Sequence, residues 1–136
     1  VPFRFHGRKG GNSLAATRAY LRLKGRDAAL TRRFARDVYA RLWIEGRDIT
    51  EAQSVAQVAA PLGVDPDELL AAIEAPQAKQ ALKDAVDAAV AKGVFGVPTF
   101  VVDGEPIWGS DRMWMLEHWL RHGSWGAVQE RQSSSE

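Results

Sequence analysis

The sequence has 136 residues, of which 46% are hydrophobic and 26% charged, a size and composition that suit a single globular domain. Its 18 basic and 17 acidic residues leave a net charge of +1, so there is no electrostatic reason to expect nucleic acid or an anionic membrane as a partner. No apolar run is long enough to span a bilayer. Because there is no cysteine, these residues contain no disulfide, zinc–thiolate site or Cys-x-x-Cys centre, which is compatible with a reducing cytoplasm.

Apolar residues at helical spacing predict five helices before residue 93. The clearest pattern places Leu30, Phe34, Val38 and Leu42 at intervals of four, which gives one apolar face. Capping residues and Gly or Pro breakers set the bounds. The five expected helices run from Asn12 or Ser13 to Gly25, from about Asp27 to Glu45, from a cap at Asp48 or Thr50 to Pro61, from Asp65-Pro66 onward, and from Pro76 to about Lys92.

A β-hairpin is predicted after these helices. Residues 98–102 and 105–108 are mostly β-branched or apolar, and Asp103-Gly104 between them is among the strongest local signals for a hairpin turn. Two strands alone make a marginal sheet in water. We therefore expect the hairpin to pair with strands that these residues do not contain.

A last helix is expected from Arg112 to Arg121, with Gly123 ending it. Ser110 and Asp111 are suitable residues to cap it, and Met113, Leu116 and Leu120 should face a core. The polar residues 126–136, which end in Ser-Ser-Ser-Glu, predict a disordered tail.

Four stretches of the chain together resemble one family. They are Asn12-Ser13-Leu14-Ala15-Ala16 with Arg18, Arg41-Leu42-Trp43 through Asp48-Ile49, Gly93-Val94-Phe95-Gly96-Val97-Pro98-Thr99, and Gly109-Ser110-Asp111-Arg112. In order and spacing they resemble the helical insertion and the C-terminal hairpin and helix of 2-hydroxychromene-2-carboxylate isomerases and kappa-class glutathione transferases. The third and fourth stretches, in that order, are the most specific.

The resemblance implies an α/β fold, thioredoxin-like with a helical insertion domain as in DsbA-like proteins, this chain being mostly helical with one C-terminal β-hairpin. It divides the chain into a helical insertion domain (1–92), a C-terminal ββα part of the thioredoxin-like domain (93–125) and the tail (126–136). It also implies a preceding strand–helix–strand segment carrying the serine that activates the glutathione thiol. No serine here has that context, so we expect this segment to lie before Val1 and leave the catalytic residue unassigned.

The Val97-Pro98 pair is the first candidate for ligand binding. The proline can be read as an ordinary trans residue at the start of a strand, where its missing N–H does no harm. The thioredoxin-like resemblance instead implies a cis bond. In that arrangement the backbone N–H and C=O of Val97 would pair with the cysteinyl backbone of glutathione, with Pro98 holding the geometry.

Ser110 and Asp111 are the second candidate. Helix capping alone would explain them. The resemblance implies a further role, in which Ser110 and nearby backbone amides bind the γ-glutamyl carboxylate of glutathione, and Asp111 binds its ammonium group. His6, His118 and His122 have no metal-ligand spacing with carboxylates, so no metal is expected.

The leading functional hypothesis is a glutathione-dependent isomerase of the 2-hydroxychromene-2-carboxylate isomerase type, acting in aromatic compound degradation. The glutathione thiol would add to an aromatic-derived acid, allow a bond rotation and leave again. The alternatives are a kappa-class-like glutathione transferase, a DsbA-like thiol–disulfide oxidoreductase whose Cys-x-x-Cys lies outside these residues, and a non-catalytic helical binding module. A cytoplasmic homodimer without nucleic-acid or membrane partners is expected.

Overall fold

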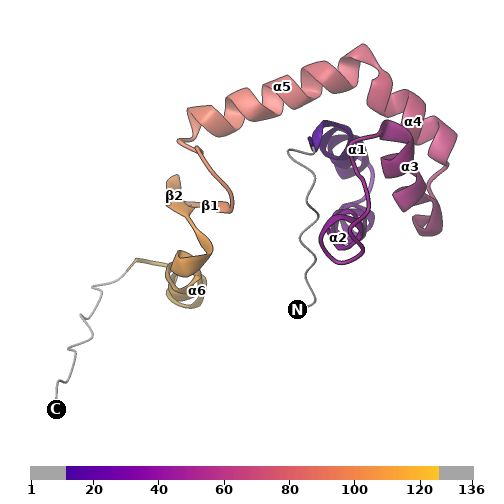
Figure 1. Ribbon diagram of the computed structural model, residues 1–136. Coiled ribbons are helices and arrows are strands. Elements are labelled where there is room, and N and C mark those ends of the chain that lie inside the picture. Colours follow the sequence, from indigo (N-terminus) through magenta and orange to yellow (C-terminus); the bar gives the residue numbers. More distant parts are fainter. Residues whose placement is uncertain (1–11, 126–136) are drawn as a thin grey trace. The chain divides into compact units, whose positions relative to one another are not determined.

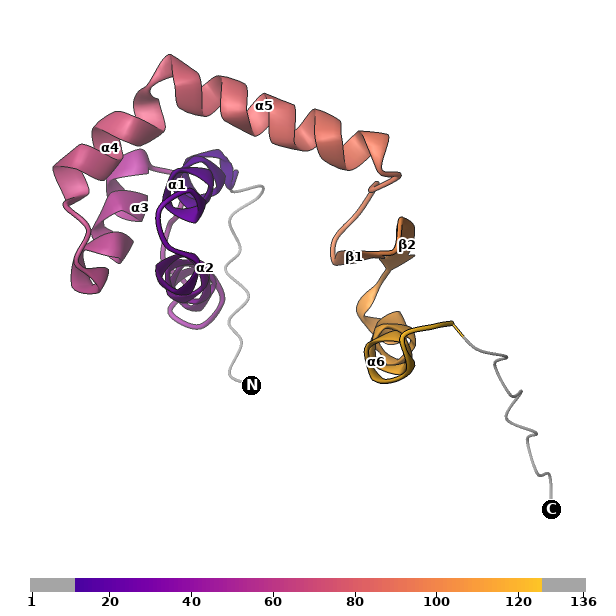
Figure 2. The same ribbon diagram turned by 180° about the vertical axis from the view of Figure 1, so that it is seen from behind.

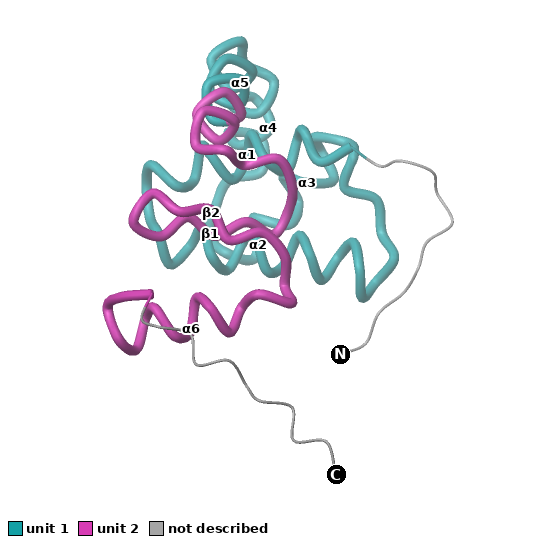
Figure 3. Tube along the Cα trace, turned by 90° about the vertical axis from the view of Figure 1, so that its left-hand side faces the viewer, with its two compact units in different colours: residues 1–85 teal, residues 86–136 magenta. Residues whose placement is uncertain are grey.

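The computed structural model describes residues 12–125, so the predicted tail (126–136) and residues 1–11 lie outside the described part. The chain divides into two compact units, residues 1–85 and 86–136, shown in teal and magenta in Figure 3. The boundary falls inside the fifth helix. The sequence-based division, with its boundary after residue 92, stays a prediction. None of the described helices has the length and hydropathy that crossing a membrane requires.

The first unit is helical, as the apolar periodicity predicted (Figures 1 and 2). Helix α3 packs against α1, α2 and α4, and α1 also packs against α2 and α4. The fully buried side chains Leu23, Phe34, Val55 and Ile73 come from four different helices and form the centre of the core. The helices are α1 (Leu14–Lys24), α2 (Ala28–Trp43), α3 (Ala52–Ala59) followed by the 3-10 turn η1 (Ala60–Leu62), α4 (Pro66–Glu74) and α5 (Pro76–Ala91), which continues into the second unit.

Two aspartates cap helices as their sequence positions suggest. Asp27 accepts hydrogen bonds from the N–H groups of Ala29 (2.7 Å) and Leu30 (3.0 Å) at the start of α2. These bonds, that from Leu30 first, hold the pKa of Asp27 below the usual 3.8 for an aspartate. Asp65 caps α4 in the same way, with Pro66 at the first helical position.

The cap predicted for α3 is wrong. Glu51, and neither Asp48 nor Thr50, occupies the N-cap position, and its side chain makes no capping bond. Asp48 instead accepts hydrogen bonds from the backbone N–H and the hydroxyl of Thr50, both at 2.7 Å, which closes a turn before the helix. The hydroxyl of Ser54 donates to the Asp48 carbonyl oxygen at 2.8 Å and ties that turn to α3. Asp and Thr favour such local turns as strongly as caps, so sequence alone could not separate the two.

The second unit contains the predicted β-hairpin. Strands β1 (Thr99–Val102) and β2 (Glu105–Trp108) pair antiparallel, with Val102 opposite Glu105 next to the turn and Thr99 opposite Trp108 at the other end. The turn residues Asp103 and Gly104 have φ values of 50° and 84°. Two successive positive φ angles are what a two-residue type I′ turn requires, and they explain the Asp-Gly pair.

The last helix differs from its prediction at its start and on its inward face. Ser110–Arg112 forms a 3-10 turn (η2), and α6 (Met113–His122) follows with Arg112 at its N-cap and no capping side chain. Met113 and Leu120 are 51% and 69% exposed, so within residues 12–125 they do not face a core as predicted. Most apolar residues of this helix, among them Leu116 and Trp119, still share one face, but few described residues of the second unit pack against that face.

Candidate functional site

Backbone pairing continues for one residue beyond the hairpin and joins the two candidate site segments. The N–H of Gly109 donates to the carbonyl oxygen of Pro98 at 3.0 Å. This bond places Val97 next to Ser110 and Asp111 at the end of the hairpin opposite the turn. The structure therefore brings together all four residues singled out from the sequence.

The loop that carries Val97 is held on both of its sides. The hydroxyl of Thr99 donates to the carbonyl oxygen of Gly96 at 2.6 Å. On the other side, the indole of Trp108 lies so close to Gly96 that a Cβ atom there would meet its Nε1 at 2.6 Å. The ring of Phe95 also contacts Trp108, with centroids 5.2 Å apart. Only glycine fits at position 96 while the indole stays in place, a constraint that the sequence alone did not reveal.

Val97 lies between these fixed points and is 90% exposed. The Val97–Pro98 peptide bond is cis. Within residues 12–125, neither the backbone N–H nor the backbone C=O of Val97 forms a hydrogen bond. This short stretch of backbone therefore has one donor and one acceptor available for a ligand.

Ser110 and Asp111 are both exposed, and neither side chain hydrogen-bonds to the described part of the chain. Their backbone N–H groups are likewise unpaired within residues 12–125. Gly109 has a φ of 102°, and a Cβ atom at that position would collide with the Asp111 carboxylate. The capping prediction for this pair is thus wrong, because η2 places both residues before α6 begins.

The exposed groups at this end of the hairpin suit a small, extended, peptide-like ligand. The Val97 backbone can form a short antiparallel pairing with a peptide bond. The backbone N–H groups of Ser110 and Asp111 and the hydroxyl of Ser110 can donate hydrogen bonds to a carboxylate. The Asp111 carboxylate can accept hydrogen bonds from an ammonium group. The combination matches the α-amino carboxylate end of a peptide.

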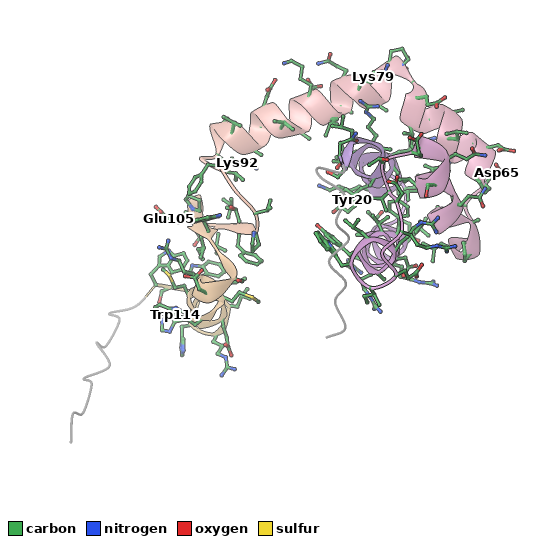
Figure 4. All side chains as sticks on the ribbon, viewed as in Figure 1. Tyr20, Asp65, Lys79, Lys92, Glu105 and Trp114 are labelled. Atoms are coloured by element: carbon green, nitrogen blue, oxygen red, sulfur yellow. The ribbon has the colours of Figure 1, made fainter. Side chains whose placement is uncertain are left out.

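Two cavities of the first unit are lined by none of the four site residues predicted from the sequence. One, of about 610 Å³, lies between α1 and α2 and has Tyr20 (Figure 4), Tyr39 and Trp43 among its walls. The other, of about 410 Å³, has Arg18 and Arg22 in its lining. Sequence reasoning missed both, because they depend on how the helices pack. In the described part of the chain, no group of three or more His, Asp or Glu side chains is arranged for a metal ion.

Comparison with known proteins gives consistent matches. Glutathione S-transferase kappa 1 of Homo sapiens is 35% identical over 115 residues, covering 79% of this chain and 51% of the relative. 2-Hydroxychromene-2-carboxylate isomerase of Sphingobium xenophagum is 32% identical over 102 residues, covering 75% and 51% respectively. The chain thus spans about half the length of these relatives.

A solved structure agrees with these sequence matches. The structure of a 2-hydroxychromene-2-carboxylate isomerase superposes with a TM-score of 0.78 at 26% identity, covering 89% of this chain and 58% of that one. The family described as DSBA-like thioredoxin domain matches residues 1–121. The predicted fold class is confirmed: the helices and the hairpin are those of a DsbA-like thioredoxin fold. The chain belongs to the DSBA-like thioredoxin domain family.

Proposed function

We propose that this protein is a glutathione-dependent enzyme, an isomerase of the 2-hydroxychromene-2-carboxylate isomerase type that acts on an aromatic-derived acid in aromatic compound degradation. The observation that carries the proposal is the hydrogen bond from Gly109 to Pro98, because it assembles one ligand-sized site from two separate sequence segments. The names of the two enzyme relatives, a kappa-class glutathione transferase and an isomerase, support it.

Each part of glutathione has its own partner among the exposed groups of this site. Its cysteinyl backbone pairs with the N–H and C=O of Val97, and Pro98 holds that segment against Gly109. Its γ-glutamyl carboxylate accepts hydrogen bonds from Ser110 and from the N–H groups of Ser110 and Asp111. Its ammonium group donates to the Asp111 carboxylate.

When bound, glutathione supplies a nucleophilic thiol, which this cysteine-free sequence does not contain. The residues described here bind and orient it. The residue that activates the thiol is not assigned among them. Phe95 (77% exposed) and Trp108 (44% exposed) lie beside Val97 and offer aromatic surface to a ring-bearing substrate.

A kappa-class-like glutathione transferase is the second candidate, favoured by the 35% identity to Glutathione S-transferase kappa 1. The two activities share the glutathione site and differ in whether the thiol leaves again or stays joined to an electrophile.

A cytoplasmic location and a homodimer are part of the proposal, and sedimentation velocity at micromolar concentration tests the dimer.

Calorimetric titration of the full-length protein with glutathione tests the shared part of the proposal. We expect saturable binding below millimolar glutathione. Parallel assays with 2-hydroxychromene-2-carboxylate and with a chloronitrobenzene electrophile then separate isomerase from transferase. A protein that binds no glutathione at millimolar concentration would remove both enzyme hypotheses.

A further inference from the structure

A few of the residues that line the cavity of about 410 Å³ in the first unit are polar, and the rest are apolar. It is bounded by α1, the end of α4 and the first turns of α5, and its polar side chains are Arg18, Arg22 and Gln77. Leu21, Gly25 and four alanines form the remaining walls. A pocket with a few polar groups on an apolar lining is the usual form of a small-molecule site.

Arg18 has hydrogen-bonding capacity that the described chain leaves unused. Its Nε is out of contact with solvent and has no acceptor among residues 12–125. None of the described residues forms an ion pair with Arg18. Because it has no carboxylate partner among these residues, the Arg18 guanidinium in the cavity lining is available to pair with an anion.

The charge around the cavity favours an anion. Arg22 lies 3.8 Å from Glu68, and Arg26 contacts the same carboxylate oxygen at 2.9 Å. One carboxylate is therefore shared by two guanidinium groups, and Arg18 adds a third positive charge. The first turn of α5 borders the cavity and has no acidic side chain to offset this excess.

We propose that this cavity binds a monocarboxylate with a compact apolar body, an assignment independent of the glutathione site. The guanidinium of Arg18 forms the charge-assisted pair with the carboxylate, and Arg22 and Gln77 lie in the same lining. Leu21 and the alanines contact the apolar part. Inorganic phosphate lacks an apolar portion and leaves those walls uncovered, which argues for a carboxylate with a hydrocarbon body.

The experiment is a calorimetric titration of the full-length protein with hexanoate, with hexanol and inorganic phosphate as separate probes. Hexanoate should bind saturably, and the two other probes should not. Arg18→Gln should weaken hexanoate binding about tenfold or more, the worth of a hydrogen bond to a charged group. Arg33→Gln, at an exposed position of α2 in the same unit, should leave binding unchanged.

Melting curves separate a ligand role from a structural one. Because Arg18 forms no ion pair or side-chain hydrogen bond within the described chain, Arg18→Gln should not lower the melting temperature. Ala78→Leu is an independent variant that keeps both arginines and fills part of the cavity, so it should also reduce hexanoate binding. Equal hexanoate affinity in Arg18→Gln, tighter binding of phosphate than of hexanoate, or no saturable binding of hexanoate would each overturn the proposal.

Discussion

At the scale of single residues, Asp111 gives the sharpest test of the glutathione site. Asp111→Asn removes a charge but makes no other large change. It should weaken glutathione binding by about 1.5–3 kcal/mol, the worth of a charge-assisted hydrogen bond. Its melting temperature should stay that of the wild type, because the Asp111 side chain caps no helix.

Asp103→Asn is the matched control for this measurement. Asp103 is also exposed and belongs to the same unit, but it lies in the turn at the other end of the hairpin. Calorimetry should show unchanged glutathione affinity for it. If the two variants bind alike, Asp111 has no part in ligand binding.

Gly96 tests how the Val97 loop is held. Gly96→Ala would place a Cβ atom 2.6 Å from Nε1 of Trp108, so either the indole or the loop must move. We expect a loss of about 1–3 kcal/mol in unfolding free energy, typical of overpacking, together with weaker glutathione binding.

Gly25→Ala serves as the comparison for Gly96→Ala. Gly25 has a φ of −74°, and the nearest atom to an added Cβ is 4.0 Å away. Urea unfolding should therefore show little change for this variant. Adding Trp108→Ala to Gly96→Ala should recover part of the lost stability; if it does not, the indole is not the obstacle.

At the scale of elements, the cap of α2 makes stability depend on pH. The Asp27 pKa lies below its usual 3.8 in the folded protein, because the carboxylate accepts hydrogen bonds from Leu30 and Ala29. The stabilising contribution of this cap is therefore fully present when the pH lies above the pKa that Asp27 has in the unfolded chain. It is lost as the pH falls through the lower pKa of the folded protein. Asp27→Asn keeps a capping side chain that does not titrate.

Urea unfolding at about pH 5 and about pH 3 should show a smaller loss of stability on acidification for Asp27→Asn than for the wild type. An equal loss in both proteins would mean that this cap does not contribute to acid sensitivity.

The elements also show where sequence reasoning succeeds and where it stops. In α2 the apolar residues occur every four positions on one face, and Phe34 and Val38 are buried as the pattern predicts. In α6 most apolar residues also share one face, but the described residues of the second unit leave much of that face uncovered, so Leu120 is exposed and not inside as predicted. Local hydrogen bonds decide the caps: Asp27 and Asp65 cap helices, whereas Asp48 closes a turn.

At the scale of the whole molecule, the two units differ in how much they bury. The core cluster lies entirely in residues 15–73 of the first unit. Among the described residues of the second unit, Ile107 is the one buried hydrophobic side chain. A fragment of residues 12–85 should therefore unfold cooperatively on heating, whereas a fragment of residues 86–125 should show no cooperative transition.

Circular dichroism of the two fragments checks this difference. A cooperative transition in the shorter fragment, or none in the longer, would contradict it.

The sequence predicted the helices and the hairpin because periodicity and turn residues are local signals. The Gly96–Trp108 contact and the cavity at Arg18 depend on packing between separate segments, so they became visible only in three dimensions.

The Asp103–Gly104 turn also has a practical use. Glu105, the residue after it, is exposed (Figure 4) and lies at the opposite end of the hairpin from Val97 and Asp111. Because these 136 residues contain no cysteine, Glu105→Cys would introduce the one thiol among them. In a protein of these 136 residues, one maleimide fluorophore could then be attached there without touching the candidate site, so that its anisotropy follows the tumbling of the hairpin while ligands are added.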